Sequence, residues 1–125
     1  QYFDFIHREK LLDINKEADV ALILFSRHKN HYSIKSNRLY ESIYLETPVI
    51  VSNFKKWAAF IKKYPLGIAV DPRSSVSISE ALLEIYNDKY SGKKFMTNCK
   101  SLKDKFTWDL QNYDLINILN DYVNN

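Results

Sequence analysis

The chain has 125 residues, which is enough for one domain with a single hydrophobic core. Hydrophobic residues make up 46% of it and charged residues 26%, so a packed domain is expected and not a disordered or fibrous chain. The net charge is +3, and the 18 lysines and arginines are scattered among fifteen acidic residues. This balance does not favour nucleic-acid binding. The only cysteine, Cys99, excludes an internal disulfide and a zinc site built on several cysteines.

The sequence contains no obvious membrane or secretion segment. No apolar run approaches the roughly 20 residues that span a bilayer, and the first residues lack the basic-then-apolar pattern of a signal peptide. We therefore expect a cytoplasmic protein. Four lysines flank two aromatic residues on one expected helix: Lys55, Lys56, Lys62 and Lys63 beside Trp57 and Phe60. Peripheral contact with anionic lipid at the inner face of the membrane is one interpretation, and a solvated lysine face over buried rings is the other.

Apolar runs and helical patterns alternate along the first seventy residues. A strand is expected at 2–6 and a helix at 8–18, and continuous apolar runs follow at 20–25, 48–51 and 67–70. Continuous runs are typical of parallel strands that are covered on both faces. Helical segments lie between them. This order predicts an α/β fold with a Rossmann-like parallel sheet of about four strands and flanking helices.

Helices are expected to follow the last strand. The pattern from Ser77 to Glu80 resembles a capping box, and it predicts a helix that buries Ile78, Leu82 and Ile85. Two C-terminal helices are expected at 91–105 and 108–123. No linker or repeat divides the chain, so residues 1–125 are expected to form a single domain.

The segment from Ser36 to Ser52 carries the most informative pattern. It reads S-N-R-L-Y-E-S-I-Y-L-E-T-P-V-I-V-S. It resembles the K-L-F-E-Y-M-A-x-G-x-P-V-I-x-S signature of GT-B glycosyltransferases, with Arg38 where that family often has lysine and Glu41 at the position of its glutamate. Thr47 departs from the pattern, because the family usually has glycine at this turn or beside it.

The likeness continues on both sides of that segment. Residues 18–24 resemble the family's A-D-V-x-L strand, residues 66–72 its G-x-x-V-D-P, and residues 106–108 its final F-x-W. The resemblance covers nearly the whole chain. It implies part of the C-terminal, donor-binding domain of a glycosyltransferase, which would work with an N-terminal domain found in the rest of a longer protein.

The resemblance implies specific roles in binding a nucleotide-sugar. Glu41 would hold the ribose, because a carboxylate accepts hydrogen bonds from two vicinal hydroxyls. Asn37 lies four residues earlier on the same helix face. Ser36 or Asn37 would cap the helix, and its free amides together with Arg38 would face a diphosphate. His7, which is followed by Arg8, would lie near the nucleobase.

One position departs from many relatives of this family. Ser33 stands where they carry a second glutamate that contacts the donor sugar, and Tyr32 and Asn30 are candidates to take its place. The catalytic residues are not assigned. No metal or other cofactor is expected, since His28 and His31 have no acidic or cysteine ligand beside them and such enzymes usually need no bound metal.

The expected activity is transfer of a sugar from a nucleotide-sugar to a glycan, lipid or protein acceptor, as in polysaccharide biosynthesis. A GT-B sugar epimerase is a second reading of the same fold. A non-catalytic subunit that docks a partner glycosyltransferase is a third, and the change to Ser33 keeps it open. An α/β signalling module is a fourth, although the run at 20–25 ends in Phe, is followed by Ser, and lacks the aspartate that a receiver domain phosphorylates.

Overall fold

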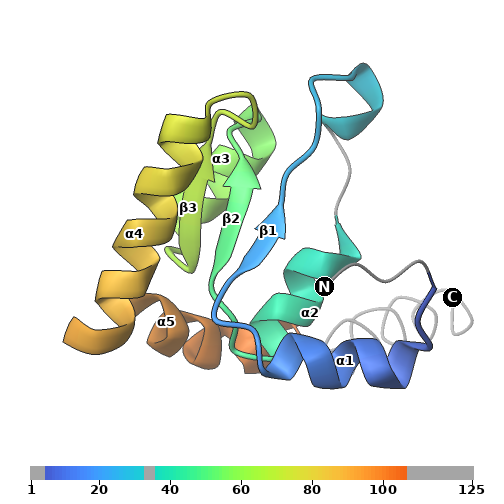
Figure 1. Ribbon diagram of the computed structural model, residues 1–125, viewed down its shortest axis with the longest axis vertical. Coiled ribbons are helices and arrows are strands. Elements are labelled where there is room, and N and C mark those ends of the chain that lie inside the picture. The colour runs from blue at the N-terminus through green and yellow to red at the C-terminus, as the bar shows by residue number, and fades with distance from the viewer. Residues whose placement is uncertain (1–4, 33–35, 107–125) are drawn as a thin grey trace, which may run out of the picture.

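The computed structural model of the chain describes residues 5–32 and 36–106 (Figure 1). In this part, five helices flank one parallel sheet of three strands, which confirms the expected α/β class. The strands are β1 (Ala21–Ile23), β2 (Val49–Ser52) and β3 (Gly67–Val70). The helices are α1 (Arg8–Lys16), α2 (Asn37–Tyr44), α3 (Lys55–Lys63), α4 (Ser75–Ser91) and α5 (Lys94–Lys103).

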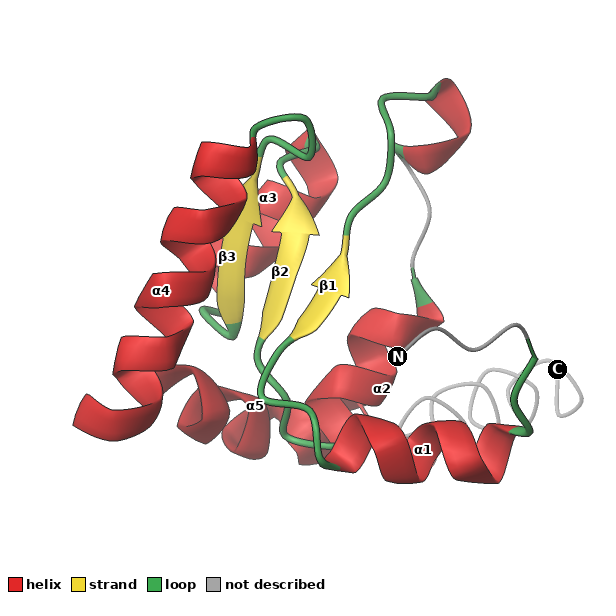
Figure 2. Cartoon of the chain, in the orientation of Figure 1, coloured by secondary structure: helices red, strands yellow, loops and turns green. Residues whose placement is uncertain are grey.

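The strands lie in the order β1-β2-β3 (Figure 2). Leu22, Ile50 and Ile68 are aligned across them. All four residues of β2 are buried, as expected for a central parallel strand with a continuous apolar run. The expected fourth strand at 2–6 is not seen in the described part, where Phe5 and Ile6 lie outside any strand. The rest of that segment is outside the described residues. The described sheet therefore has three strands and not four.

The two faces of the sheet are covered unequally. On one face, Ile23, Val49 and Val51 pack in a core with α2, α3 and α5. The other face meets α4, and its core is smaller. It contains Ile50, Val70, Ala81, Ile85 and Phe95.

The outer strand β1 is only partly covered. Leu22 of β1 keeps 47% of its surface exposed, and α1 buries none of its residues. Within the described residues, the sheet is therefore incompletely covered at β1. No helix in the described ranges has the length and apolar content needed to cross a bilayer.

The start of α4 differs from the sequence-based expectation. Ser74 is the N-cap, and its hydroxyl accepts a hydrogen bond from the Ser77 backbone N–H at 3.1 Å. The expected capping box beginning at Ser77 is therefore wrong, because that residue lies inside the helix. Leu82 is 36% exposed, whereas Ala81 and Ile85 are buried, so the helix faces the sheet with a slightly different side than expected.

The later helices can be compared with the sequence only in part. The helix expected at 91–105 is present as α5, which is shorter and buries Phe95, Cys99 and Leu102. A short 3-10 turn, Asp104–Phe106, follows it. The helix expected at 108–123 lies outside the described residues.

Candidate functional site

The carboxyl ends of the three parallel strands meet at one edge of the sheet, which is where open α/β sheets usually bind ligands. The loops at this edge are tied to one another. Phe25 N–H donates to Ser52 Oγ at 2.8 Å, and Ser52 Oγ donates to Phe25 C=O at 3.1 Å. Arg27 Nη2 lies 3.8 Å from Asp71 Oδ2, linking the loops that follow β1 and β3. Side-chain contacts therefore link the segments at the carboxyl ends of the three strands.

Glu41 lies in the second turn of α2 and faces the start of α1. Its Oε1 atom is 3.6 Å from Arg8 Nη2, and its side chain keeps 29% of its surface exposed. The Arg8 side chain is 80% exposed, so the pair is open to solvent. Such pairs contribute little stability, about 1 kcal/mol or less. The carboxylate is therefore accessible to a ligand, although a cation already lies beside it.

Glu41 lines a hollow of about 280 Å³, which we call the β1-edge hollow. It lies between α1 and α2 and runs along β1. Its polar lining comes from Asn15, Arg38, Glu41, Ser42 and Thr47, and its apolar wall from residues such as Leu11 and Leu22. Ser42 Oγ is engaged, since it donates to Arg38 C=O at 2.8 Å. The expected pair of Arg38 and Glu41 is thus found in one hollow.

The expected helix cap is only partly confirmed. Ser36 occupies the N-cap position of α2 and is buried, but its side chain makes no capping hydrogen bond. Asn37 is the first helical residue and is exposed. Ser33 lies outside the described residues. The N-terminal turn of α2 therefore has no side-chain cap from Ser36.

Of the expected site residues that the structure describes, these do not line the β1-edge hollow: Ser36, Asn37, Tyr32 and His7. The Tyr32 ring packs edge-on against Phe54, with 4.9 Å between ring centroids, and it lines a separate hollow at the start of α3. His7 is the N-cap residue of α1, and its ring contacts the Phe5 ring at 5.6 Å. Only its neighbour Arg8 reaches Glu41.

Sequence reasoning missed Asn15 and Ser42 as lining residues. Asn15 belongs to no motif, whereas Ser42 directly follows Glu41 in the segment from Ser36 to Ser52, so its position was an available signal. Sequence reasoning also missed Arg27, although its position just after a buried run was an available signal. Loops at that end of a strand often carry ligand-binding side chains.

The two histidines of the β1–α2 loop have their own partners. Their rings lie 5.7 Å apart. His31 Nδ1 is 2.9 Å from Ser26 C=O, and His28 Nδ1 accepts from Asn30 N–H at 3.3 Å. Within residues 5–32 and 36–106, no group of three or more metal-ligating side chains is assembled. The histidines therefore shape this loop.

Cys99 is fully buried beneath the turn that follows α2. Its thiol is 3.6 Å from Thr47 C=O and 3.8 Å from Leu66 C=O. Burial, helped by the negative charge of Glu46, raises the pKa of Cys99 to about 12. The residue is therefore a protonated core side chain at neutral pH and not a thiolate nucleophile.

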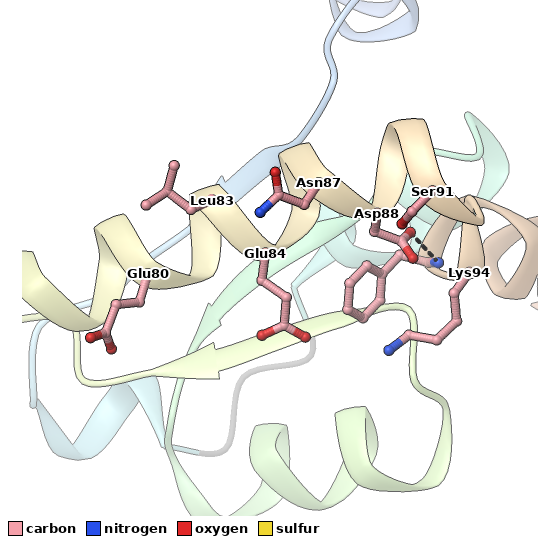
Figure 3. A pocket seen from close by; sticks show the side chains of 8 residues that line it. Glu80, Leu83, Glu84, Asn87, Asp88, Ser91 and Lys94 are labelled. Carbon is pink, nitrogen blue, oxygen red and sulfur yellow. Dashed lines mark hydrogen bonds between the residues drawn. The ribbon is translucent and has the colours of Figure 1, made fainter.

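A larger hollow, of about 500 Å³, lies where α4 meets α5 (Figure 3). Glu80 and Glu84 project from α4 into solvent on this side, and the Asp88 carboxylate accepts from Phe95 N–H at 3.1 Å. The Lys94 ammonium lies 4.4 Å from the centre of the Phe95 ring. Asp88 thus fastens the start of α5 to α4, which indicates a structural role.

Comparison of the chain with protein-family models, curated proteins and solved structures finds no match. The functional interpretation therefore depends on the fold, the β1-edge hollow and the residues around it.

Proposed function

We propose that this chain supplies donor binding in a glycosyltransferase that uses a nucleotide-sugar. One observation carries the proposal: Arg38 and Glu41, the two residues singled out by the resemblance to GT-B enzymes, line a single hollow at a partly open strand edge. The carboxylate of Glu41 is partly exposed, so it can accept hydrogen bonds from a ligand.

Each group has a defined role in this proposal. The Glu41 carboxylate binds the ribose hydroxyls, and Arg38 with the first amides of α2 faces the diphosphate. Fixed positive groups of this kind stabilise the nucleoside diphosphate as it leaves, while a hydroxyl of a glycan, lipid or protein acceptor attacks the anomeric carbon. The acceptor binds to a second domain of the enzyme, on the cytoplasmic side of the membrane.

A second candidate is a non-catalytic subunit that keeps the fold and docks a partner glycosyltransferase. The Arg8–Glu41 ion pair favours it, because the carboxylate already has a cationic neighbour within the chain. In this alternative the pair closes the end of the β1-edge hollow, and nucleotides do not bind there.

The test is a thermal-shift panel of nucleoside diphosphates and nucleotide-sugars on the chain and on Glu41→Gln. A ligand at 100 times its dissociation constant should stabilise the folded state by about 2.7 kcal/mol. We expect this stabilisation with one base, a smaller effect with its 2′-deoxy analogue, and none in Glu41→Gln. Glu84→Gln is the matched control, because Glu84 is an exposed glutamate on α4.

Two results would contradict the donor-binding proposal. If no nucleotide stabilises the wild-type chain, the docking alternative is favoured. If a nucleotide stabilises the wild type and Glu41→Gln equally, Glu41 does not hold the ribose. Loss of binding in Glu84→Gln would indicate a general effect of charge.

A further inference from the structure

Another hollow, of about 420 Å³, opens beyond the carboxyl ends of β1 and β2; we call it the α3 hollow. It is lined by Arg27 and Tyr32 from the loop after β1, and by Asn53, Phe54, Lys55 and Lys56 from the turn that enters α3. It shares no lining residue with the β1-edge hollow. It is therefore a separate candidate for ligand binding.

The α3 hollow has an excess of positive charge. In the described part of the chain, Lys55 and Lys56 form no ion pair with a carboxylate. Arg27 has Asp71 at 3.8 Å, but Arg73 Nε lies at the same distance from the other oxygen of that carboxylate. The described lining of the hollow thus holds three cations, Arg27, Lys55 and Lys56, and no carboxylate, an arrangement that attracts an anion.

The two lysines occupy the unfavourable end of their helix. The N-terminus of a helix carries partial positive charge, so lysines in the first turn are repelled and acidic residues are preferred. The first turn of α3 holds Lys55 and Lys56 and no acidic residue, and the side chain of Phe54 provides no cap. Lys62 and Lys63 in the last turn are favourably placed. A bound anion would offset the repulsion between these lysines and the positive end of the helix. Such local disagreements between sequence and structure concentrate at functional sites.

The wall of the α3 hollow adds a flat apolar surface. Tyr32 is 41% exposed, while Phe54, on which it packs, is only 5% exposed. A buried neighbour therefore holds the tyrosine ring at the surface of the hollow. Rings of this kind stack on sugars or bases, or contact acyl chains.

We propose that the α3 hollow binds a phosphate ester, with Arg27, Lys55 and Lys56 around the phosphate and Tyr32 against the group that carries it. Two sources share this chemistry: a soluble phosphorylated sugar or nucleotide, and the headgroup of an anionic lipid. The proposal does not depend on Glu41, so it stands whether or not the β1-edge hollow binds a nucleotide.

The test is a titration with inorganic pyrophosphate at constant ionic strength, followed by amide NMR shifts. We expect saturable shifts at the amides of residues 53–57. We also expect binding about tenfold weaker in the double variant Lys55→Gln/Lys56→Gln. The control is Lys62→Gln/Lys63→Gln, which removes the same charge from the other end of α3 and should bind like the wild type. Shifts confined to residues 36–42 would belong to the β1-edge hollow and would overturn the present proposal.

A measurement of stability without ligand provides an independent readout. Removing the two first-turn lysines should raise the melting temperature, whereas removing the two last-turn lysines should lower it. Pyrophosphate should then raise the melting temperature of the wild type more than that of Lys55→Gln/Lys56→Gln. The site is rejected if pyrophosphate causes no shift at residues 53–57, or if both double variants weaken binding equally.

Vesicle sedimentation distinguishes the two sources of phosphate. Binding to phosphatidylglycerol vesicles but not to phosphatidylcholine vesicles, with loss in Lys55→Gln/Lys56→Gln only, would assign a lipid headgroup. Pyrophosphate binding without vesicle binding would assign a soluble phosphate ester. Vesicle binding that both double variants weaken equally, without pyrophosphate shifts at residues 53–57, would overturn the site.

Discussion

At the residue scale, the backbone conformation of Glu46 produces the tight turn between α2 and β2. Glu46 has a φ of 61°, in the left-handed region that usually favours glycine. Its N–H donates to Ile43 C=O at 3.1 Å and Thr47 N–H donates to Ser42 C=O at 2.8 Å, which is the Schellman pattern of a helix end. The glycine-like position is therefore Glu46 and not Thr47. Its carboxylate is 3.4 Å from Lys103 Nζ, which links the turn to α5.

Gly67 is the position where the smallest change should have the largest effect. A Cβ atom added there would lie 1.8 Å from Val49 C=O, so alanine requires β2 and β3 to move apart. We expect Gly67→Ala to lower the free energy of unfolding by about 3 kcal/mol or more, measured by urea denaturation.

Gly92→Ala is the matched control, because nothing lies within 4 Å of a Cβ atom added at Gly92. It should change stability by no more than about 0.5 kcal/mol. Equal losses in the two variants would show that close approach of the strands is not the cause.

At the level of elements, the N-terminus of α4 shows which of several serines caps a helix. Four serines lie at or near its beginning: Ser74, Ser75, Ser77 and Ser79. A capping pattern with Glu80 favoured Ser77, but the chain leaves β3 through a turn in which Ser74 N–H donates to Asp71 C=O at 3.0 Å. That turn brings Ser74 into the capping position. The start of α4 therefore depends on the turn as well as on local pattern.

We expect Ser74→Ala to reduce the free energy of unfolding by about 1 kcal/mol, because the Ser77 N–H loses its acceptor. Ser79→Ala is the control. The Ser79 hydroxyl donates to Val76 C=O at 2.9 Å inside the helix, and alanine is the better helix former there. Ser79→Ala should be neutral or slightly stabilising in the same urea measurement. A larger loss in Ser79→Ala than in Ser74→Ala would contradict the assigned cap.

At the scale of the whole molecule, β1 forms an edge of the described sheet (Figure 2). Its middle residue, Leu22, is exposed. Unprotected strand edges pair with other chains. We expect the chain to self-associate as concentration rises, measured by light scattering, and Leu22→Lys to suppress the association. Leu83→Lys, on the exposed side of α4, is the control and should have little effect. A monomer at all concentrations would contradict this expectation.

The sequence predicted much of the architecture because burial on both faces of a parallel sheet leaves continuous apolar runs. The strand at 67–70 matches β3, and the run at 48–51 is displaced by one residue from β2. The run at 20–25 is longer than β1, because pairing with β2 ends at Ile23 and the chain then turns into a loop. Apolar character marks burial, whereas the length of a strand also depends on its partner.

The candidate sites likewise have one part that the sequence predicts and one part that only the tertiary structure determines. Local pattern placed Arg38 and Glu41 on one helix, because residues three apart lie on neighbouring positions of a helix surface. Only the tertiary structure brought Arg8 within 3.6 Å of Glu41, and only it gathered Arg27, Tyr32 and Lys55 around the α3 hollow. These contacts join segments far apart in the chain. They are decided by the way the strands pair and the loops meet at one edge, which no periodicity within a single segment records.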